Sequence, residues 1–181
     1  MKPIEINEAQ EPAKSILEAT NSKMGAIPNM FKMMANNPSL LNAYMKTDET
    51  FRKDSGFTPQ EQEVILLSVA VYNECEYCVA AHSFIAKHQS KVSKDVIDAL
   101  RDRKVLPEAK YEALSKFAVS VAKERGFPDQ EATNNLKQAG YTDLHVAGVI
   151  TGVGMKTFSN YINHISETEV DDMFAEFKWE K

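Results

Sequence analysis

Helical periodicity runs through nearly the whole sequence, and it constrains the fold more than any other feature. Apolar residues recur at intervals of three and four, a spacing that places them on one face of a helix rather than of a strand. The seven glycines and seven prolines lie mostly at segment boundaries, where these residues begin and end helices. The sequence therefore predicts an all-α protein.

The same residues predict the helix boundaries. Thr58, Pro59 and Glu61 form a strong N-terminal signal with a capping box. Gly148 and Gly152, four residues apart, favour close packing of the longest helix against a neighbour. The expected helices are 11–24, 28–35, 38–53, 58–73, one beginning at 74–76 that carries both cysteines and His82, 93–100, 107–125, 128–139 and 142–165, and then a turn over 170–177 with Met173, Phe174 and Phe177 on one face.

Length and charge limit the domain organisation and the partners. A chain of 181 residues fits one domain, here 1–181 with residues 1–10 as an extended N-terminal arm. The net charge is -5 and no basic stripe is present, which argues against nucleic acid as a partner. The N-terminal segment has no apolar core of a secretory signal, and the longest apolar runs are too short to cross a membrane. We therefore expect a cytoplasmic protein.

The two cysteines, Cys75 and Cys78, form a Cys-x-x-Cys pair followed by His82. A four-residue ring gives little loop-entropy stabilisation, so a structural disulfide is a poor explanation. Spacings of three and four bring these residues onto one face of a helix. Near a helix N-terminus, unpaired N–H groups stabilise a thiolate, and His82 can accept or relay its proton. The pattern indicates a redox-active pair.

Two other interpretations of this cluster are weaker. The cysteines and His82 could be ordinary core residues, although three reactive side chains at this spacing favour function. A closed zinc site needs four ligands, and only His88, Glu74 or a distant side chain could complete one. We therefore expect neither a metal nor a cofactor.

The spacing Glu63–x11–Cys75–x2–Cys78–x3–His82 resembles the signature of the alkylhydroperoxidase AhpD-like branch of the carboxymuconolactone decarboxylase family. Gly25–Phe31 and Asn36–Leu41 resemble the N-terminal helices of this family, and Asn160–Ile165 resembles the C-terminal segment of its peroxidase-related members. The segment Lys87–Pro107 is the least similar to the family.

This resemblance implies an all-helical protein that assembles as trimers or hexamers and acts as a disulfide-cycling thiol peroxidase. By position, Cys78 is the attacking thiol, Cys75 the resolving thiol, and His82 and Glu63 the proton relay. A hydroperoxide is the implied substrate, and a dithiol or a disulfide reductase the electron donor. Tyr77 stands where the family has a histidine between the cysteines.

Physical chemistry adds expectations of its own. A carboxylate such as Glu63 orients a neighbouring imidazole and supports its protonated form, which in turn stabilises a thiolate. His164 is a secondary candidate that could approach the thiols of its own or a neighbouring chain. Two alternative functions stay open. One is an acid/base enzyme of the lactone-decarboxylase type, which needs no thiol pair; the other is a redox-sensing or partner-binding protein with slow chemistry.

Overall fold

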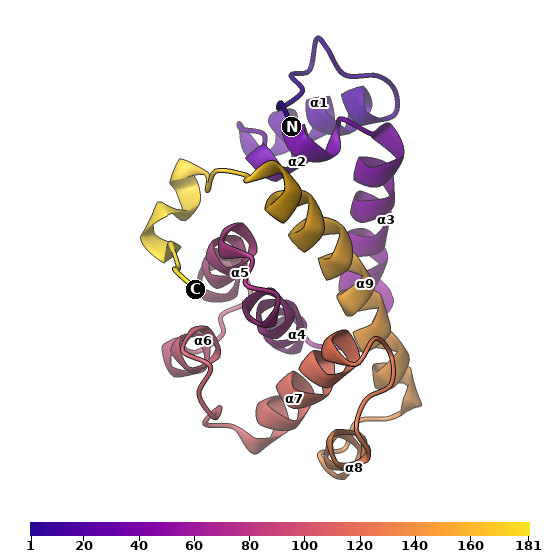
Figure 1. Cartoon of the computed structure of the whole chain (residues 1–181), viewed down its shortest axis with the longest axis vertical. Helices are drawn as coiled ribbons and strands as arrows, with labels where there is room; N and C mark the ends of the chain where they lie inside the picture. The colour runs from indigo at the N-terminus through magenta and orange to yellow at the C-terminus, as the bar shows by residue number, and fades with distance from the viewer.

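The computed structural model describes all residues, Met1–Lys181, and the secondary structure is helical throughout, without strands. The expected helices are present, with ends displaced by at most a few residues (Figure 1). They are α1 (Ala13–Met24), α2 (Asn29–Met34), α3 (Pro38–Asp54), α4 (Pro59–Tyr72), α5 (Glu76–His88), α6 (Lys94–Arg101), α7 (Ala109–Lys123), α8 (Gln130–Gln138), α9 (Asp143–Ser166) and the 3₁₀ helix η1 (Asp172–Phe177).

The start of α4 follows the expected local chemistry. The Thr58 hydroxyl accepts from the Glu61 N–H at 3.3 Å, and the Glu61 carboxylate accepts from the Thr58 N–H at 2.9 Å. This reciprocal pair satisfies two N–H groups that have no partner within the helix. The capping box fixes the first turn of α4, and Glu63 follows directly after that turn.

Helix α4 lies at the centre of the molecule and is buried on all sides from Glu61 to Val71. Figure 1 shows α4 and α5 side by side, with α9 and α3 on one flank and α7 and α6 on the other. One hydrophobic core of 40 buried residues joins these helices. The family-signature residues therefore lie on two adjoining helices in the interior.

Both ends of the chain pack against this body. Residues 1–10 form no helix, and the Ile4 N–H donates to the Lys32 carbonyl at 3.0 Å. At the other end, η1 packs on α5 through Phe174 and Phe177, which are both buried. The expected apolar face is wrong in one position, because Met173 is 43% exposed. No helix is long and apolar enough to span a lipid bilayer.

Gly148 and Gly152 allow the close approach of α9 that their spacing indicates. A Cβ atom at Gly148 would lie 2.8 Å from the Ser55 carbonyl oxygen, and one at Gly152 would lie 3.0 Å from the Ile65 side chain. A Cβ atom at Gly154, on the same helix, would meet nothing within 4 Å.

We expect Gly148→Ala to destabilise the fold by about 1–3 kcal/mol, because the contact is with backbone and cannot relax by a rotamer change. The matched control Gly154→Ala should instead raise stability by about 0.5–1 kcal/mol, since alanine is the better helix former. Urea unfolding of both variants measures this difference, and equal midpoints would contradict the close-packing role of Gly148.

Candidate active site

The two cysteines lie where α4 ends and α5 begins. Asn73 caps α4, Glu74 takes a left-handed backbone conformation (φ 56°), and Cys75 becomes the N-cap of α5. The Cys75 sulfur accepts from the Cys78 N–H at 3.4 Å. The expected placement of both thiols at a helix N-terminus is therefore confirmed, and Cys78 is in the first turn.

Helix α9 contributes two buried polar side chains to the thiols. The Asn163 amide donates to the Cys78 sulfur at 3.2 Å and approaches the Cys75 sulfur at 3.8 Å. Lys156, two turns earlier, is 1% exposed. Burial by itself would raise the pKa of Cys78, but the hydrogen bond from Cys75 and the charge of Lys156 outweigh it and hold that pKa well below its usual value. Cys78 is thus the thiol that ionises.

Cys75 has the opposite electrostatics. Its hydrogen bond to Cys78 and its own burial both raise the pKa of the Cys75 thiol. A protonated Cys75 next to an ionised Cys78 is the distribution expected when two thiols share one negative charge. The two sulfurs therefore differ in reactivity although both are buried.

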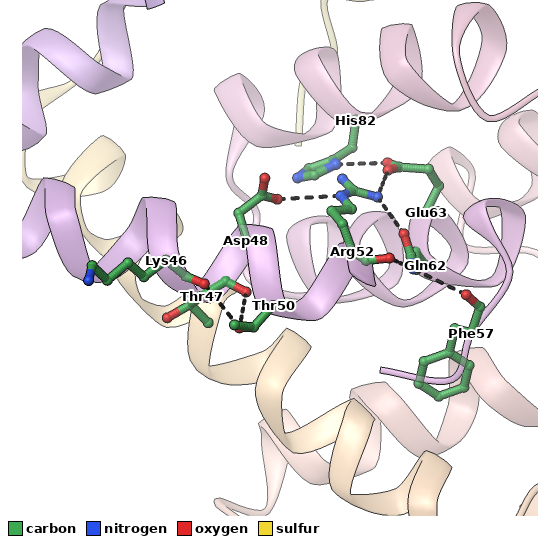
Figure 2. Close-up of polar contacts among 9 residues, drawn as sticks. All are labelled: Lys46, Thr47, Asp48, Thr50, Arg52, Phe57, Gln62, Glu63 and His82. Atoms are coloured by element: carbon green, nitrogen blue, oxygen red, sulfur yellow. Dashed lines mark hydrogen bonds and ion pairs between the residues drawn. The ribbon is translucent and has the colours of Figure 1, made fainter. Parts of the chain in front are cut away.

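Glu63 connects the helices α3, α4 and α5 through its two carboxylate oxygens. Oε2 lies 2.8 Å from Nδ1 of His82, and Oε1 accepts from the Arg52 guanidinium at 2.5 Å. Figure 2 shows Arg52 between Asp48 and Glu63, with the His82 ring above the Arg52 guanidinium and directed at the same Glu63 carboxylate. Glu63 is 1% exposed. Burial favours a raised pKa, but pairing with His82 and Arg52 holds the pKa of Glu63 below its ordinary value.

The pKa of His82 depends on burial and on Lys156 as well as on the expected effect of Glu63. Burial lowers the pKa of His82, Lys156 lowers it further, and the pairing with Glu63 offsets this only in part. The ring is therefore neutral near pH 7. With Nδ1–H donating to Glu63, the lone pair on Nε2 is free to take a proton. His82 is a base in this site, and the buried cation beside Cys78 is Lys156.

A cavity of about 600 Å³ opens onto these groups. Cys78 and His82 line it, together with Arg52 and Lys156, whereas Cys75 does not. Its apolar side chains are Met24, Met30, Phe31, Tyr44, Met45, Tyr77, Ala81, Ile85 and Phe174 among others. A larger groove of about 830 Å³ between α4, α6, α7 and α8 contains neither cysteine nor His82. Cys78 and His82 therefore face the smaller cavity, which is the candidate site.

The two secondary candidates have other environments. Tyr77 is buried, and its hydroxyl donates to Asp171 at 2.6 Å and accepts from the Met30 N–H at 3.4 Å. Burial and the Asp171 carboxylate raise the pKa of Tyr77, so its proton is committed to that bond. His164 is exposed, and the α9 side chain that meets the sulfurs is its neighbour Asn163.

We expect Tyr77→Phe to lower stability by about 1–3 kcal/mol while leaving Cys78 reactivity nearly unchanged, because the hydroxyl connects α5 to the segment before η1. The control Tyr111→Phe removes the hydroxyl of a half-buried tyrosine with no side-chain hydrogen bond and should change stability little. Thermal unfolding and alkylation rates of both variants measure this. A large fall in alkylation rate with unchanged stability would place Tyr77 in the reaction instead.

Sequence reasoning missed Arg52, Lys156 and Asn163. Arg52 is 11 residues from Glu63, which it contacts, and Asn163 is 85 residues from Cys78. Lys156, whose charge lowers the pKa of Cys78, is also distant from it in the sequence. No local spacing therefore connects these three residues to the signature. One signal was present: Lys156 and Asn163 are seven residues apart and therefore lie on the same face of α9. No group of three or more His, Cys, Asp or Glu side chains is arranged to hold a metal ion.

The fold and the candidate site together define a helical protein with a buried thiol pair at a helix start and a buried carboxylate–imidazole pair beside it. Residues 38–124 match the model of the carboxymuconolactone decarboxylase family. The match includes Lys87–Pro107, the segment whose sequence was expected to be least similar to the family. The family resemblance is therefore confirmed, and residues 38–124 belong to the carboxymuconolactone decarboxylase family. Among curated proteins, none matches the chain.

Solved structures share the fold along almost the whole chain. An alkylhydroperoxidase AhpD core protein from Ralstonia eutropha JMP134, described as uncharacterized and peroxidase-related, is 23% identical and covers 96% of this chain and 93% of its own, with a TM-score of 0.82. A peroxidase-related protein from Silicibacter sp. TM1040 is 21% identical, with coverages of 91% and 87% and a TM-score of 0.77. A cysteine-to-alanine variant of the debrominase Bmp8, in complex with 2,3,4-tribromopyrrole, is 16% identical, with coverages of 97% and 93% and a TM-score of 0.79.

Proposed function

We propose that this protein is a thiol-dependent hydroperoxide reductase in which Cys78 attacks the peroxide and Cys75 resolves the product. One observation carries the proposal: of the two thiols, Cys78 lines the cavity and has the lowered pKa, while Cys75 lies behind it with a raised pKa. A thiolate is the nucleophilic form of cysteine, so the accessible thiol is also the reactive one.

The reaction balances with the groups at hand. The Cys78 thiolate attacks the terminal oxygen of ROOH, an S–O bond forms, and the O–O bond breaks. The peroxide hydroxyl stays on sulfur as the sulfenic acid, and the leaving alkoxide takes a proton that Nε2 of His82 has first accepted from water, with the ring oriented by Glu63. Cys75 then attacks the sulfur of the sulfenic acid, the S–O bond breaks, and water leaves as the disulfide forms. A dithiol restores both thiols by exchange.

The cavity supports an organic hydroperoxide as the substrate. Its wall includes three methionines, Met24, Met30 and Met45, whose flexible side chains adapt to varied apolar groups. A volume of about 600 Å³ is far larger than hydrogen peroxide requires and lies within the usual range of small-molecule sites.

Steady-state turnover with dithiothreitol as donor tests the function. Cumene hydroperoxide and hydrogen peroxide are compared, and we expect a higher kcat/KM for cumene hydroperoxide. A parallel incubation with 2,3,4-tribromopyrrole, the compound bound in the structurally similar debrominase, is followed by bromide release. Bromide release without peroxide consumption would reject the peroxidase proposal. Peroxide consumption no faster than with dithiothreitol alone would reject it as well.

We also propose that the chain assembles as a trimer or hexamer in a reducing compartment such as the cytoplasm, where a dithiol donor is available. Exposed apolar side chains on α9, namely Leu144, Ile150, Tyr161 and Ile165, support self-association. Light scattering at low micromolar concentration should give a mass that is a multiple of three chains, and a particle of 20.3 kDa would contradict the assembly.

A further inference from the structure

Lys156 is a buried cation without a partner. It is 1% exposed, lines the cavity with Cys78, and takes part in no ion pair or side-chain hydrogen bond of the chain. Burial of an unpaired ammonium is costly, so a buried lysine normally has a compensating anion. The position of Lys156 on α9 therefore needs an explanation beyond packing.

Among the charged groups around the cavity, only one anion is left to compensate the charge of Lys156. Arg52 is paired with Glu63 and Asp48, so both nearby carboxylates already have a cation. His82 is neutral near pH 7 because its pKa is lowered. The titratable and charged side chains that line the cavity are Lys23 from α1, Tyr44, Asp48 and Arg52 from α3, Tyr77, Cys78 and His82 from α5, and Lys156 from α9.

The two tyrosines do not provide the anion. Burial raises the pKa of Tyr44 well above its ordinary value and that of Tyr77 likewise, so both hydroxyls stay protonated. Cys78 is the remaining group in the cavity that can ionise near neutral pH.

We propose that Lys156 is the counter-cation of the Cys78 thiolate, and that it sets both the pH at which Cys78 ionises and the oxidising strength of the Cys75–Cys78 pair. Lys156 acts on the reaction only through Cys78, and it is therefore a positioning residue. The inference deepens the proposed function by naming the group that activates its thiol, and it rests on Cys78 being the ionised thiol. It does not depend on which electrophile that thiol attacks.

The effect on redox strength follows from linkage. Lys156 stabilises the thiolate, which exists only in the reduced protein, so it favours reduction of the disulfide. Removing the cation should make the pair a weaker oxidant. A rise of one unit in the pKa of Cys78 reduces the dithiol–disulfide equilibrium constant tenfold, or about 30 mV for this two-electron couple.

The test measures iodoacetamide alkylation of Cys78 against pH in a Cys75→Ser background, so that one thiol reacts. Lys156→Met removes the charge and keeps an unbranched apolar side chain, and Lys156→Arg keeps the charge. Lys23→Met is the matched control, because Lys23 lines the same cavity but is exposed. We expect the midpoint to rise by at least one pH unit in Lys156→Met and to change little in the other two.

The second readout is the reduction potential of the pair in glutathione buffers, with Cys75 intact, which we expect to fall by about 30 mV or more in Lys156→Met. Thermal unfolding verifies that each variant is folded, and Lys156→Gln replaces Lys156→Met if the latter is not. An unchanged alkylation midpoint in the folded variant overturns the inference and leaves the proposed function intact. An alkylation midpoint near pH 8.5 in the protein that keeps Lys156 also overturns the inference. Peroxide turnover decides the proposed function separately.

Discussion

Cys78→Ser should reduce hydroperoxide turnover to the rate of the reaction without protein. Cys78 is the only thiol on the cavity wall and its pKa is lowered, whereas a serine hydroxyl does not ionise near neutral pH. No other side chain is placed to replace it, since Cys75 lies outside the lining and has a raised pKa.

Cys75→Ser is the matched control, because it makes the same cysteine-to-serine change at the neighbouring thiol. This variant should still react once with peroxide and then stop at the sulfenic acid, since no thiol resolves it. Mass spectrometry after dimedone treatment should find one adduct, on Cys78. A dimedone adduct on Cys75 in the Cys78→Ser variant, with none on Cys78 in the Cys75→Ser variant, would reverse the two roles.

Glu63→Gln is expected to reduce turnover on the order of 10²-fold, the size typical of losing a positioned base. Glutamine keeps the shape, but its amide cannot accept from His82 and Arg52 at once as the two carboxylate oxygens do. The His82 ring then loses the bond that fixes its tautomer, and Arg52 loses a buried counter-charge.

The pH dependence of this variant separates two explanations. With a neutral His82, removal of the Glu63 charge takes away an anion near Cys78, so the pKa of Cys78 should stay level or fall. If a protonated His82 were the partner of the thiolate, the pKa of Cys78 would rise instead. Cys78 alkylation against pH in both proteins measures the sign, and a rise of one unit would restore the imidazolium interpretation.

Glu61→Gln gives a matched control on the same helix. Glu61 is also buried, and hydrogen bonds from Lys110, Thr58 and Tyr141 overcome its burial and lower its pKa to about 2. It does not line the cavity. This variant should lose stability through its weakened capping box and keep its turnover per folded molecule. Equal losses of turnover in both variants would mean that Glu63 acts through stability alone.

The parts of the site that sequence alone predicted are those whose geometry is local. Cys75, Cys78 and His82 are connected by helical spacing, and the N-terminal position of the thiols follows from the helix break at residues 73–75. Roles for Cys78 and Cys75 came from the family resemblance, and the cavity and the pKa directions support them.

The charge state of His82 shows where local reasoning is incomplete. A carboxylate beside an imidazole predicts a protonated ring, and Glu63 does lie 2.8 Å from it. Burial and the charge of Lys156 shift the pKa in the other direction. Burial comes from the packing of several helices on α5, and Lys156 comes from α9, more than 70 residues away along the chain.

The sequence by itself therefore determined the helices, their caps and the thiol pair, because hydrophobic period, capping residues and i, i+3 and i, i+4 spacings act within a few residues. Only the tertiary structure decided which thiol faces the cavity, which cation accompanies it and whether His82 carries a charge. Those properties depend on desolvation and Coulomb interactions, which are set by distance in space: Arg52, Lys156 and Asn163 come to the site on α3 and α9.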